Sequence, residues 1–240
     1  MTGDDPEQHR STLARPFTCT LILALVLLTA CTAHRRRGPA EEIPPEVKEA
    51  WEDREVEAYL FDTEIEYEGK YSSVRLELFA TDSIVGIGGR SYLGKGALDG
   101  WLTADSVRLL FPQSNEYVYE PVARLLRTFE CTGERRPDIP LLAFFFARPD
   151  RVDIGPDVAM MIDSSDTDRP VFSLSMPDCP WSIELIYDRR DTGWRIREFT
   201  FDNGDNLQIE ARRREYHDEV DAKARMFTVS VPIDARRIIP

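Results

Sequence analysis

Alternation between apolar and polar residues is the main pattern of the chain after residue 57. Phe61, Thr63, Ile65 and Tyr67 alternate with acidic residues, and the same period resumes after the turn signal Glu68-Gly69-Lys70. A period of two puts one set of side chains on each face of a strand, so both segments are predicted to be half-buried strands of an antiparallel sheet. Nine further strands are predicted at 83–88, 97–103, 106–111, 158–162, 171–176, 181–187, 194–201, 207–213 and 226–231.

Three segments have helical spacing instead. Residues 46–57 lack Gly and Pro, residues 120–131 place apolar side chains at helical offsets, and residues 138–148 (DIPLLAFFFAR) are strongly apolar. Each segment is predicted to be a helix. Strands without a βαβ alternation indicate a mostly β (α+β) fold, in which about eleven strands form one strongly curved antiparallel sheet with helices packed on one side.

The first thirty residues have the pattern of a secretory signal peptide. Arg10 and Arg15 precede the apolar run FTCTLILALVLL, which is shorter than the about 20 residues that a membrane-spanning helix needs. The run ends in Leu28-Thr29-Ala30-Cys31, which resembles the lipobox of bacterial lipoproteins. The resemblance implies that residues 1–30 are cleaved and that Cys31 is diacylated. The alternative is an ordinary secreted protein with a coincidental cysteine.

Residues 31–45 are predicted to be a flexible tether behind the lipid, and residues 46–240 a single domain. The tether contains Arg35-Arg36-Arg37, which is either a membrane-surface contact or a solvated charge run. Thr32 follows Cys31, and Thr permits outer-membrane sorting where Asp would favour the inner membrane. We therefore predict a lipid-anchored protein on the periplasmic face of the outer membrane.

Two cysteines remain in the predicted domain. Cys131 and Cys179 are an even pair in an oxidising compartment, so they are either a disulfide or two buried free thiols. The full chain carries 30 Lys and Arg residues against 43 Asp and Glu residues, a net charge of −13. Because general nucleic-acid-binding proteins are basic, this charge argues against a nucleic-acid partner.

The chain has no recognisable catalytic or metal-binding pattern. The stretch GRSYLGKG, residues 89–96, resembles a phosphate-binding loop, but Gly96 stands where the magnesium-binding Ser or Thr belongs. Asp163, Asp166 and Asp168 lack the Gly and the terminal Glu of a calcium-binding loop, so a polar turn is favoured. His217 is the one histidine of residues 46–240, and a single histidine is more often structural than a triad base. We predict a protein that is not an enzyme and has no metal and no cofactor.

The order of parts resembles the LolA/LolB-like superfamily, which comprises the periplasmic carrier and the outer-membrane receptor that move lipoproteins. The similarity lies in the stretches SVRLELFATDSIVGIGGRSYLGKGALDGWLTADSVRLLFPQSNEYVYEP and RPDIPLLAFFFARPD. The resemblance implies an incomplete β-barrel in which an N-terminal helix and an internal helix pair cover an apolar cavity for acyl chains. Plain core packing is the alternative for each predicted cavity-lining residue, and these residues are Leu76, Leu78, Leu125, Phe129, Leu142, Phe145, Phe146 and Trp181.

The same resemblance assigns a role to one short loop. The receptor-type member exposes a Leu within a Pro-Leu-Gly loop between two early strands and uses it to pass lipoprotein to the membrane. At the matching place this chain has Tyr92-Leu93-Gly94, so the Leu and Gly match and Tyr92 replaces the Pro. Tyr92 and Leu93 are thus expected to contact the membrane or an acyl chain at a hairpin tip. The alternative is a Leu packed under its own loop.

Two functions agree with these patterns. The first is a membrane-anchored monomer that binds acyl chains of lipids or lipoproteins during lipoprotein localisation to the outer membrane, with a periplasmic carrier protein as candidate partner. The second is a structural or assembly lipoprotein of the envelope that binds a protein partner through a sheet edge or the apolar helix pair. This second function predicts a filled interior without a ligand cavity.

Overall fold

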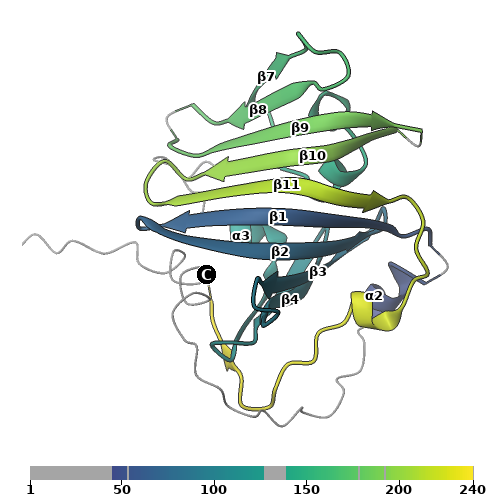
Figure 1. Ribbon diagram of the computed structural model, residues 1–240, viewed down its shortest axis with the longest axis vertical. Helices are drawn as coiled ribbons and strands as arrows, with labels where there is room; N and C mark the ends of the chain where they lie inside the picture. The colour runs from purple at the N-terminus through teal and green to yellow at the C-terminus, as the bar shows by residue number, and fades with distance from the viewer. Residues whose placement is uncertain (1–44, 53, 127–138, 178, 192, 240) are drawn as a thin grey trace, which may run out of the picture.

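The computed structural model describes residues 45–52, 54–126, 139–177, 179–191 and 193–239 (Figure 1). Twelve strands form one open, curved sheet in the order β12-β6-β5-β4-β3-β2-β1-β11-β10-β9-β8-β7. The first six strands are β1 (Glu57–Tyr67), β2 (Lys70–Ala80), β3 (Ile84–Ser91), β4 (Gly96–Thr103), β5 (Ser106–Phe111) and β6 (Glu116–Pro121). The others are β7 (Ala159–Asp163), β8 (Val171–Ser175), β9 (Ser182–Arg190), β10 (Gly193–Asp202), β11 (Leu207–His217) and β12 (Arg236–Arg237). The predicted mostly β class with one curved sheet is therefore confirmed.

Strand β1 joins the two halves of the sheet. It pairs antiparallel with β2 from Glu57 to Tyr67 and, on its other side, with the late strand β11. The β1–β2 hairpin turns at Glu68 and Gly69, whose φ angles of 50° and 74° are those of a two-residue hairpin loop. Residues far apart in the sequence, such as Ala58 and His217, are consequently opposite each other in the sheet.

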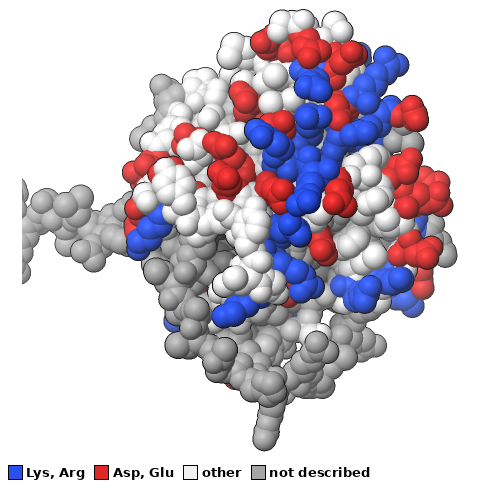
Figure 2. Space-filling model, in the orientation of Figure 1, with Lys and Arg blue, Asp and Glu red and all other residues white. Residues whose placement is uncertain are grey.

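The two faces of the sheet bury different clusters. One face, called the inner face below, holds the larger cluster around Tyr59, Phe61 and Tyr187. The opposite, outer face of the first strands holds a smaller cluster around Trp101 and Phe227. Elsewhere the outer face is largely polar, and charged residues of both signs cover it (Figure 2). The alternation in the sequence therefore corresponds to two faces that are packed differently.

The predicted N-terminal helix is much shorter than expected. Helix α2 covers Pro45–Glu49, and the chain then turns so that Trp51 stacks on Phe227 with ring centroids 5.6 Å apart. Val56 is fully buried, and Glu57 already pairs with Ala80 in the sheet. Contacts with distant residues therefore override the helical propensity of residues 50–57. The prediction of a helix over these residues is wrong.

The predicted α-helix over residues 138–148 is also wrong. This segment contains a single 3-10 turn, η2 (Ala143–Phe145), and a second one, η3 (Pro149–Arg151), follows it. Its carbonyl groups at Phe144 and Phe145 face tyrosine hydroxyls of the sheet instead of continuing a helical ladder. The other predicted helix, over residues 120–131, exists as α3 (Val122–Leu126), and its last five residues lie outside the described part of the chain.

Ten of the eleven predicted strands are present, and β6 and β12 were not predicted. The exception is the segment 226–231, which follows the 3-10 turn η4 (Ala224–Met226) without joining the sheet. It lies flat on the outer face of β3, where a Cβ atom on Gly86 would be 1.9 Å from the carbonyl oxygen of Met226. A segment that lies on a face cannot form a strand ladder, because the ladder bonds lie within the sheet.

Within the described residues, no helix is both long enough and apolar enough to cross a membrane.

Candidate functional site

A short apolar segment, residues 139–147, covers the inner face of the sheet and is called the covering segment below. Pro140 and Pro149 bracket its 3-10 turn, so neither end continues as a helix. Phe144 is buried in the inner cluster, whereas the flanking apolar side chains are only partly buried against it. These flanking residues are Leu141, Leu142, Phe145 and Phe146.

Two tyrosines of the sheet hold the backbone of the covering segment. The Tyr187 hydroxyl donates to the carbonyl oxygen of Phe144 at 2.9 Å, and the Tyr59 hydroxyl lies 3.2 Å from that of Phe145. The rings of Tyr59 and Phe145 also meet edge to face, with centroids 5.6 Å apart. The covering segment is thus attached by a few polar contacts and by apolar packing, without a regular helix of its own.

A buried ion pair lies beside this attachment. The Glu57 carboxylate accepts hydrogen bonds from Nε of Arg195 at 2.8 and 3.0 Å, and Tyr59 donates to the same carboxylate at 2.6 Å. Burial and then the Glu57 charge raise the pKa of Tyr59. Burial alone would lower the pKa of Arg195, but its bond to Glu57 raises it overall, so the guanidinium stays charged. Its charge lies over the ring of Phe146, 5.9 Å from the centroid.

Around the covering segment, the inner face carries apolar side chains that are only partly buried. They come from β2, β3, β9, β10 and β11 and contact the edge of the inner cluster. Cross-strand register places Ile209 beside Phe201 and Ile183 opposite Phe201, so these side chains share the inner face. The apolar rim, as we call it below, consists of Leu76, Ile87, Ile183, Phe199, Leu207 and Ile209.

The structure brings six of the eight predicted cavity-lining residues together on the inner face. Leu78 and Trp181 are buried in the inner cluster, and Leu76, Leu142, Phe145 and Phe146 are partly buried against it. Leu125 lies in α3, but its side chain is outside the described part, as is all of Phe129. The predicted residues therefore form one apolar surface, and whether that surface encloses a cavity stays a prediction.

The loop with Tyr92 and Leu93 is an exposed hairpin tip between β3 and β4. Tyr92 is 70% exposed and Leu93 is 86% exposed, so Leu93 is not packed under its own loop. The amide of Gly94 donates to the carbonyl of Ser91 at 2.8 Å, and Gly94 has a φ of 75°, which favours glycine. The turn thus presents Leu93 to solvent.

The predicted lipidation and disulfide involve residues that the structure covers only in part. Cys179 is disulfide-bonded and contacts the inner cluster. Cys31 and Cys131 lie outside the described residues, so the lipid on Cys31 and the pairing of Cys131 with Cys179 stay predictions.

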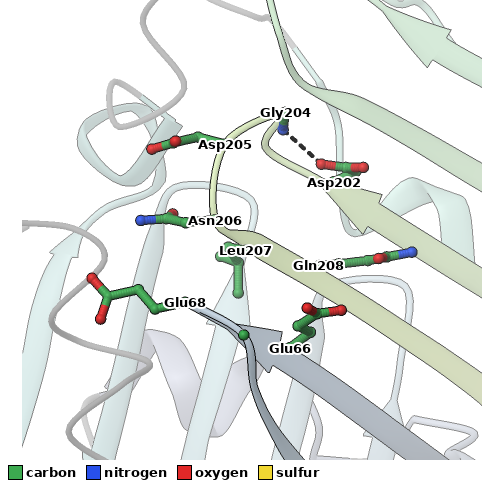
Figure 3. Close-up of a pocket in the computed structure, with 9 residues that line it drawn as sticks. Glu66, Glu68, Asp202, Gly204, Asp205, Asn206, Leu207 and Gln208 are labelled. Atoms are coloured by element: carbon green, nitrogen blue, oxygen red, sulfur yellow. Dashed lines mark hydrogen bonds between the residues drawn. The ribbon is translucent and has the colours of Figure 1, made fainter.

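A polar pocket opens at the end of the sheet where the β1–β2 and β10–β11 hairpins meet (Figure 3). Glu66, Glu68, Asp202 and Asp205 line it, and the Asp202 carboxylate accepts the amide of Gly204 at 2.6 Å. In the described ranges, no three His, Cys, Asp or Glu residues are grouped to hold a metal ion. The polar turn predicted at residues 163–168 is present, since the Asp163 carboxylate accepts the amide of Ser165 at 2.9 Å.

Sequence reasoning missed the polar residues that support the covering segment. Glu57 and Arg195 are 138 positions apart, and each belongs to a strand in which charged residues are common. Tyr59 and Tyr187 look like ordinary core aromatics in the sequence. A pattern search could have noted only that Glu57 stands on the apolar face of its strand, two residues before Tyr59.

No family model matches this chain, and no curated protein matches it. Three similar solved structures are an uncharacterized conserved protein from Thermus thermophilus, a DUF1329 family protein from Desulfovibrio piger and a LolA superfamily protein from Nitrosomonas europaea. Their sequence identities to this chain are 10%, 7% and 8%, and their TM-scores are 0.42, 0.40 and 0.35. The matches cover 80%, 76% and 77% of this chain and 94%, 92% and 94% of the other chains.

Proposed function

We propose that this chain is a membrane-anchored lipoprotein that binds acyl chains of lipids or lipoproteins on the inner face of its sheet. The observation that carries the proposal is the apolar rim, which leaves partly exposed Leu, Ile and Phe side chains around the covering segment. Soluble domains rarely leave a contiguous apolar surface unused, so such a surface favours a ligand that covers it. Because binding needs no covalent step, the proposed activity is non-catalytic.

The affinity comes from apolar burial. Each methylene group that leaves water contributes about 0.8 kcal/mol, so even part of an acyl chain provides the free energy of a stable complex. The covering segment suits exchange, because hydrogen bonds from only a few side chains hold its backbone. The lipid predicted on Cys31 keeps the protein at the periplasmic face of the outer membrane, which suits a receptor in lipoprotein localisation better than a soluble carrier.

Two measurements test this function. Native mass spectrometry of protein purified without detergent is expected to show bound lipid, and a fluorescent fatty acid is expected to bind the delipidated protein. Ile209→Gln, in the apolar rim, should weaken that binding about tenfold by removing apolar contact and placing an amide against the chain. Ile233→Gln is the matched control, because Ile233 is 83% exposed and lies outside the sheet. The proposal is wrong if neither lipid nor fatty acid binds.

A second candidate function rests on the sheet edge at β7. All five residues of this strand are exposed, and Met160, Met161 and Ile162 are 39%, 70% and 44% exposed. The strand contains neither Pro nor Lys, the residues that usually block an edge. An assembly lipoprotein could pair this edge with a strand of an envelope protein. In that case Met161→Lys should abolish a complex seen after crosslinking in envelopes, and the purified protein should carry no lipid.

A further inference from the structure

Basic side chains gather in a band across the outer face of the sheet, over β9 to β11 and down across β1 and β2 (Figure 2). Such a gathering is unexpected in a chain with a net charge of −13. We call it the arginine band and define it by Arg75, Arg90, Arg197, Arg212 and Arg214, which strand register and ion pairs connect.

Strand register and ion pairs connect the members of the arginine band. Asp62 stands opposite Arg75 on one side and opposite Arg212 on the other, so all three share the outer face. The Asp62 carboxylate lies 3.7 Å from Arg75 and 3.9 Å from Arg214. The Glu198 carboxylate in turn lies 3.2 Å from Arg212 and 3.4 Å from Arg197. The band is therefore one continuous surface that crosses several strands.

Carboxylates accompany the arginines along this surface, and Asp62, Glu198 and Glu215 each lie within 4.0 Å of a guanidinium group of the band. Arg75 and Arg90 stand directly opposite each other in β2 and β3, an arrangement of like charges that weakens strand pairing. Asp188 alone lies within 4.0 Å of three guanidinium groups, those of Arg190 at 3.0 Å, Arg197 at 3.9 Å and Arg213 at 2.5 Å. The pair Arg75 and Arg90 thus places two guanidinium groups side by side without serving strand pairing, and a ligand with negative charge would offset their repulsion.

One end of the arginine band adjoins the exposed hairpin tip. Arg90 lies two residues before Tyr92, and Lys95 on the other side of Leu93 is also exposed. An exposed apolar tip beside a row of cations combines the two features that bind an anionic bilayer, namely side chains that enter the headgroup region and charges that attract phosphates.

We propose that the arginine band docks this protein on an anionic bilayer surface through lipid phosphates and points the Leu93 tip toward the acyl region. This inference rests on the membrane contact in the proposed function and adds how the protein is oriented there. Curvature of the sheet keeps some arginines away from a flat bilayer. Electrostatic attraction nevertheless acts over about 10 Å at moderate salt, so they need not touch it.

Vesicle sedimentation of the full chain with Cys31→Ala tests the docking. Binding is measured to vesicles that contain phosphatidylglycerol and to vesicles of phosphatidylcholine alone, over a series of salt concentrations. The protein is expected to prefer the anionic vesicles and to lose that preference as salt increases. Arg75→Gln/Arg212→Gln should weaken binding to the anionic vesicles by about tenfold or more, because each arginine near such a surface contributes several-fold.

A matched control removes the same charge elsewhere. Arg151 has a side chain that is 76% exposed, and Arg169 is exposed in the loop between β7 and β8. Arg151→Gln/Arg169→Gln should bind both kinds of vesicle as the parent does. Residues 1–44 are identical in all variants, so differences between variants report the described domain. Equal losses in the two double variants, or no loss in either, would overturn the proposal.

Two further measurements distinguish docking on a bilayer from binding of free phosphate and from the proposed binding of acyl chains. If inorganic phosphate displaces the protein more strongly than sodium chloride at equal ionic strength, a free phosphate is the ligand and the proposal is wrong. Fatty-acid binding is measured on the same variants and should be unchanged in Arg75→Gln/Arg212→Gln. A parent protein that binds no fatty acid but docks on anionic vesicles through the band would refute the proposed function and leave this inference standing.

Discussion

The Glu57 carboxylate and the Arg195 guanidinium form a buried ion pair that joins β1 to β10 beneath the covering segment. Both side chains are almost inaccessible to water, with 10% and 8% of their surface exposed. A buried charge that keeps its partner is tolerated, whereas a buried charge that loses its partner is strongly destabilising. The pair therefore makes the stability of the domain sensitive to either residue.

Glu57→Gln is expected to lower the free energy of unfolding by about 3 kcal/mol, because it leaves the buried Arg195 charge without a counter-ion. Urea unfolding followed by tryptophan fluorescence measures the change. Glu55→Gln is the control two residues earlier, where the side chain is exposed, and it should change the stability by less than about 0.5 kcal/mol. A similar loss in both variants would contradict this account.

Gly86→Ala should destabilise the domain by about 3 kcal/mol, since the new methyl group would overlap the backbone of Met226. The same substitution two residues along the strand provides the comparison. A Cβ atom on Gly88 would have its nearest neighbour at 3.8 Å, so Gly88→Ala should keep the parent stability or improve it slightly. Thermal unfolding of the two variants distinguishes them, and equal melting temperatures would show that residues 224–229 do not pack on β3.

The two tyrosines at the covering segment predict a loss of stability at alkaline pH. Burial raises the pKa of Tyr59 and of Tyr187, whereas both ionise near about 10 in the unfolded chain. The unfolded state therefore gives up these protons first, and the free energy of unfolding should decrease as pH rises above about 10. Tyr187→Phe should make this decrease smaller. Tyr92→Phe, at the exposed hairpin tip, should leave the pH dependence as it is in the parent.

Leu93→Glu should leave the free energy of unfolding within about 0.5 kcal/mol of the parent, as substitutions of exposed residues usually do. The same change should impair transfer of acylated cargo to liposomes, because a carboxylate at the tip is repelled by anionic headgroups. Tyr71→Glu is the control variant, because it places the same charge at another exposed position. Tyr71 is 74% exposed and lies near the β1–β2 hairpin. Normal transfer by Leu93→Glu would remove the loop from the mechanism.

Cys31→Ala should convert a membrane-bound protein into a soluble periplasmic one, since the predicted acyl chains attach to that residue. Cell fractionation followed by immunoblotting measures the distribution. If the variant still sediments with membranes, the lipid anchor is not what holds the protein there.

Much of the sheet could be predicted from the sequence because each strand shows its two faces locally. Phe61 and Thr63 are buried while Asp62 is accessible, as their alternation requires. Strand β6 escaped prediction because its buried positions include Glu116 and Glu120, which read as solvent-facing. Arg236 pairs with Glu116 and Arg237 with Glu120, more than a hundred residues later, and no local pattern indicates these distant pairs. Glu120 also pairs with the nearby Arg124.

The site was predictable only in its apolar part. Leucines and phenylalanines of the covering segment stand out in any sequence, so their gathering on the inner face follows from hydrophobicity. Their backbone conformation does not follow, because Tyr59 and Tyr187 determine it from strands far away in the chain. The arginine band likewise depends on register, since Arg75, Arg90 and Arg212 become neighbours only when β1, β2, β3 and β11 are aligned.

The position of β1 between β2 and β11 also fixes when the domain can be completed during biosynthesis. As the chain is synthesised from its N-terminus, β1 can pair with β2 at once, but its other edge stays open until residues 207–217 have emerged. For that interval an apolar strand edge is available to other chains, which is the condition under which nascent proteins aggregate. A protein with this topology is therefore exposed to aggregation for as long as the residues between β2 and β11 take to emerge.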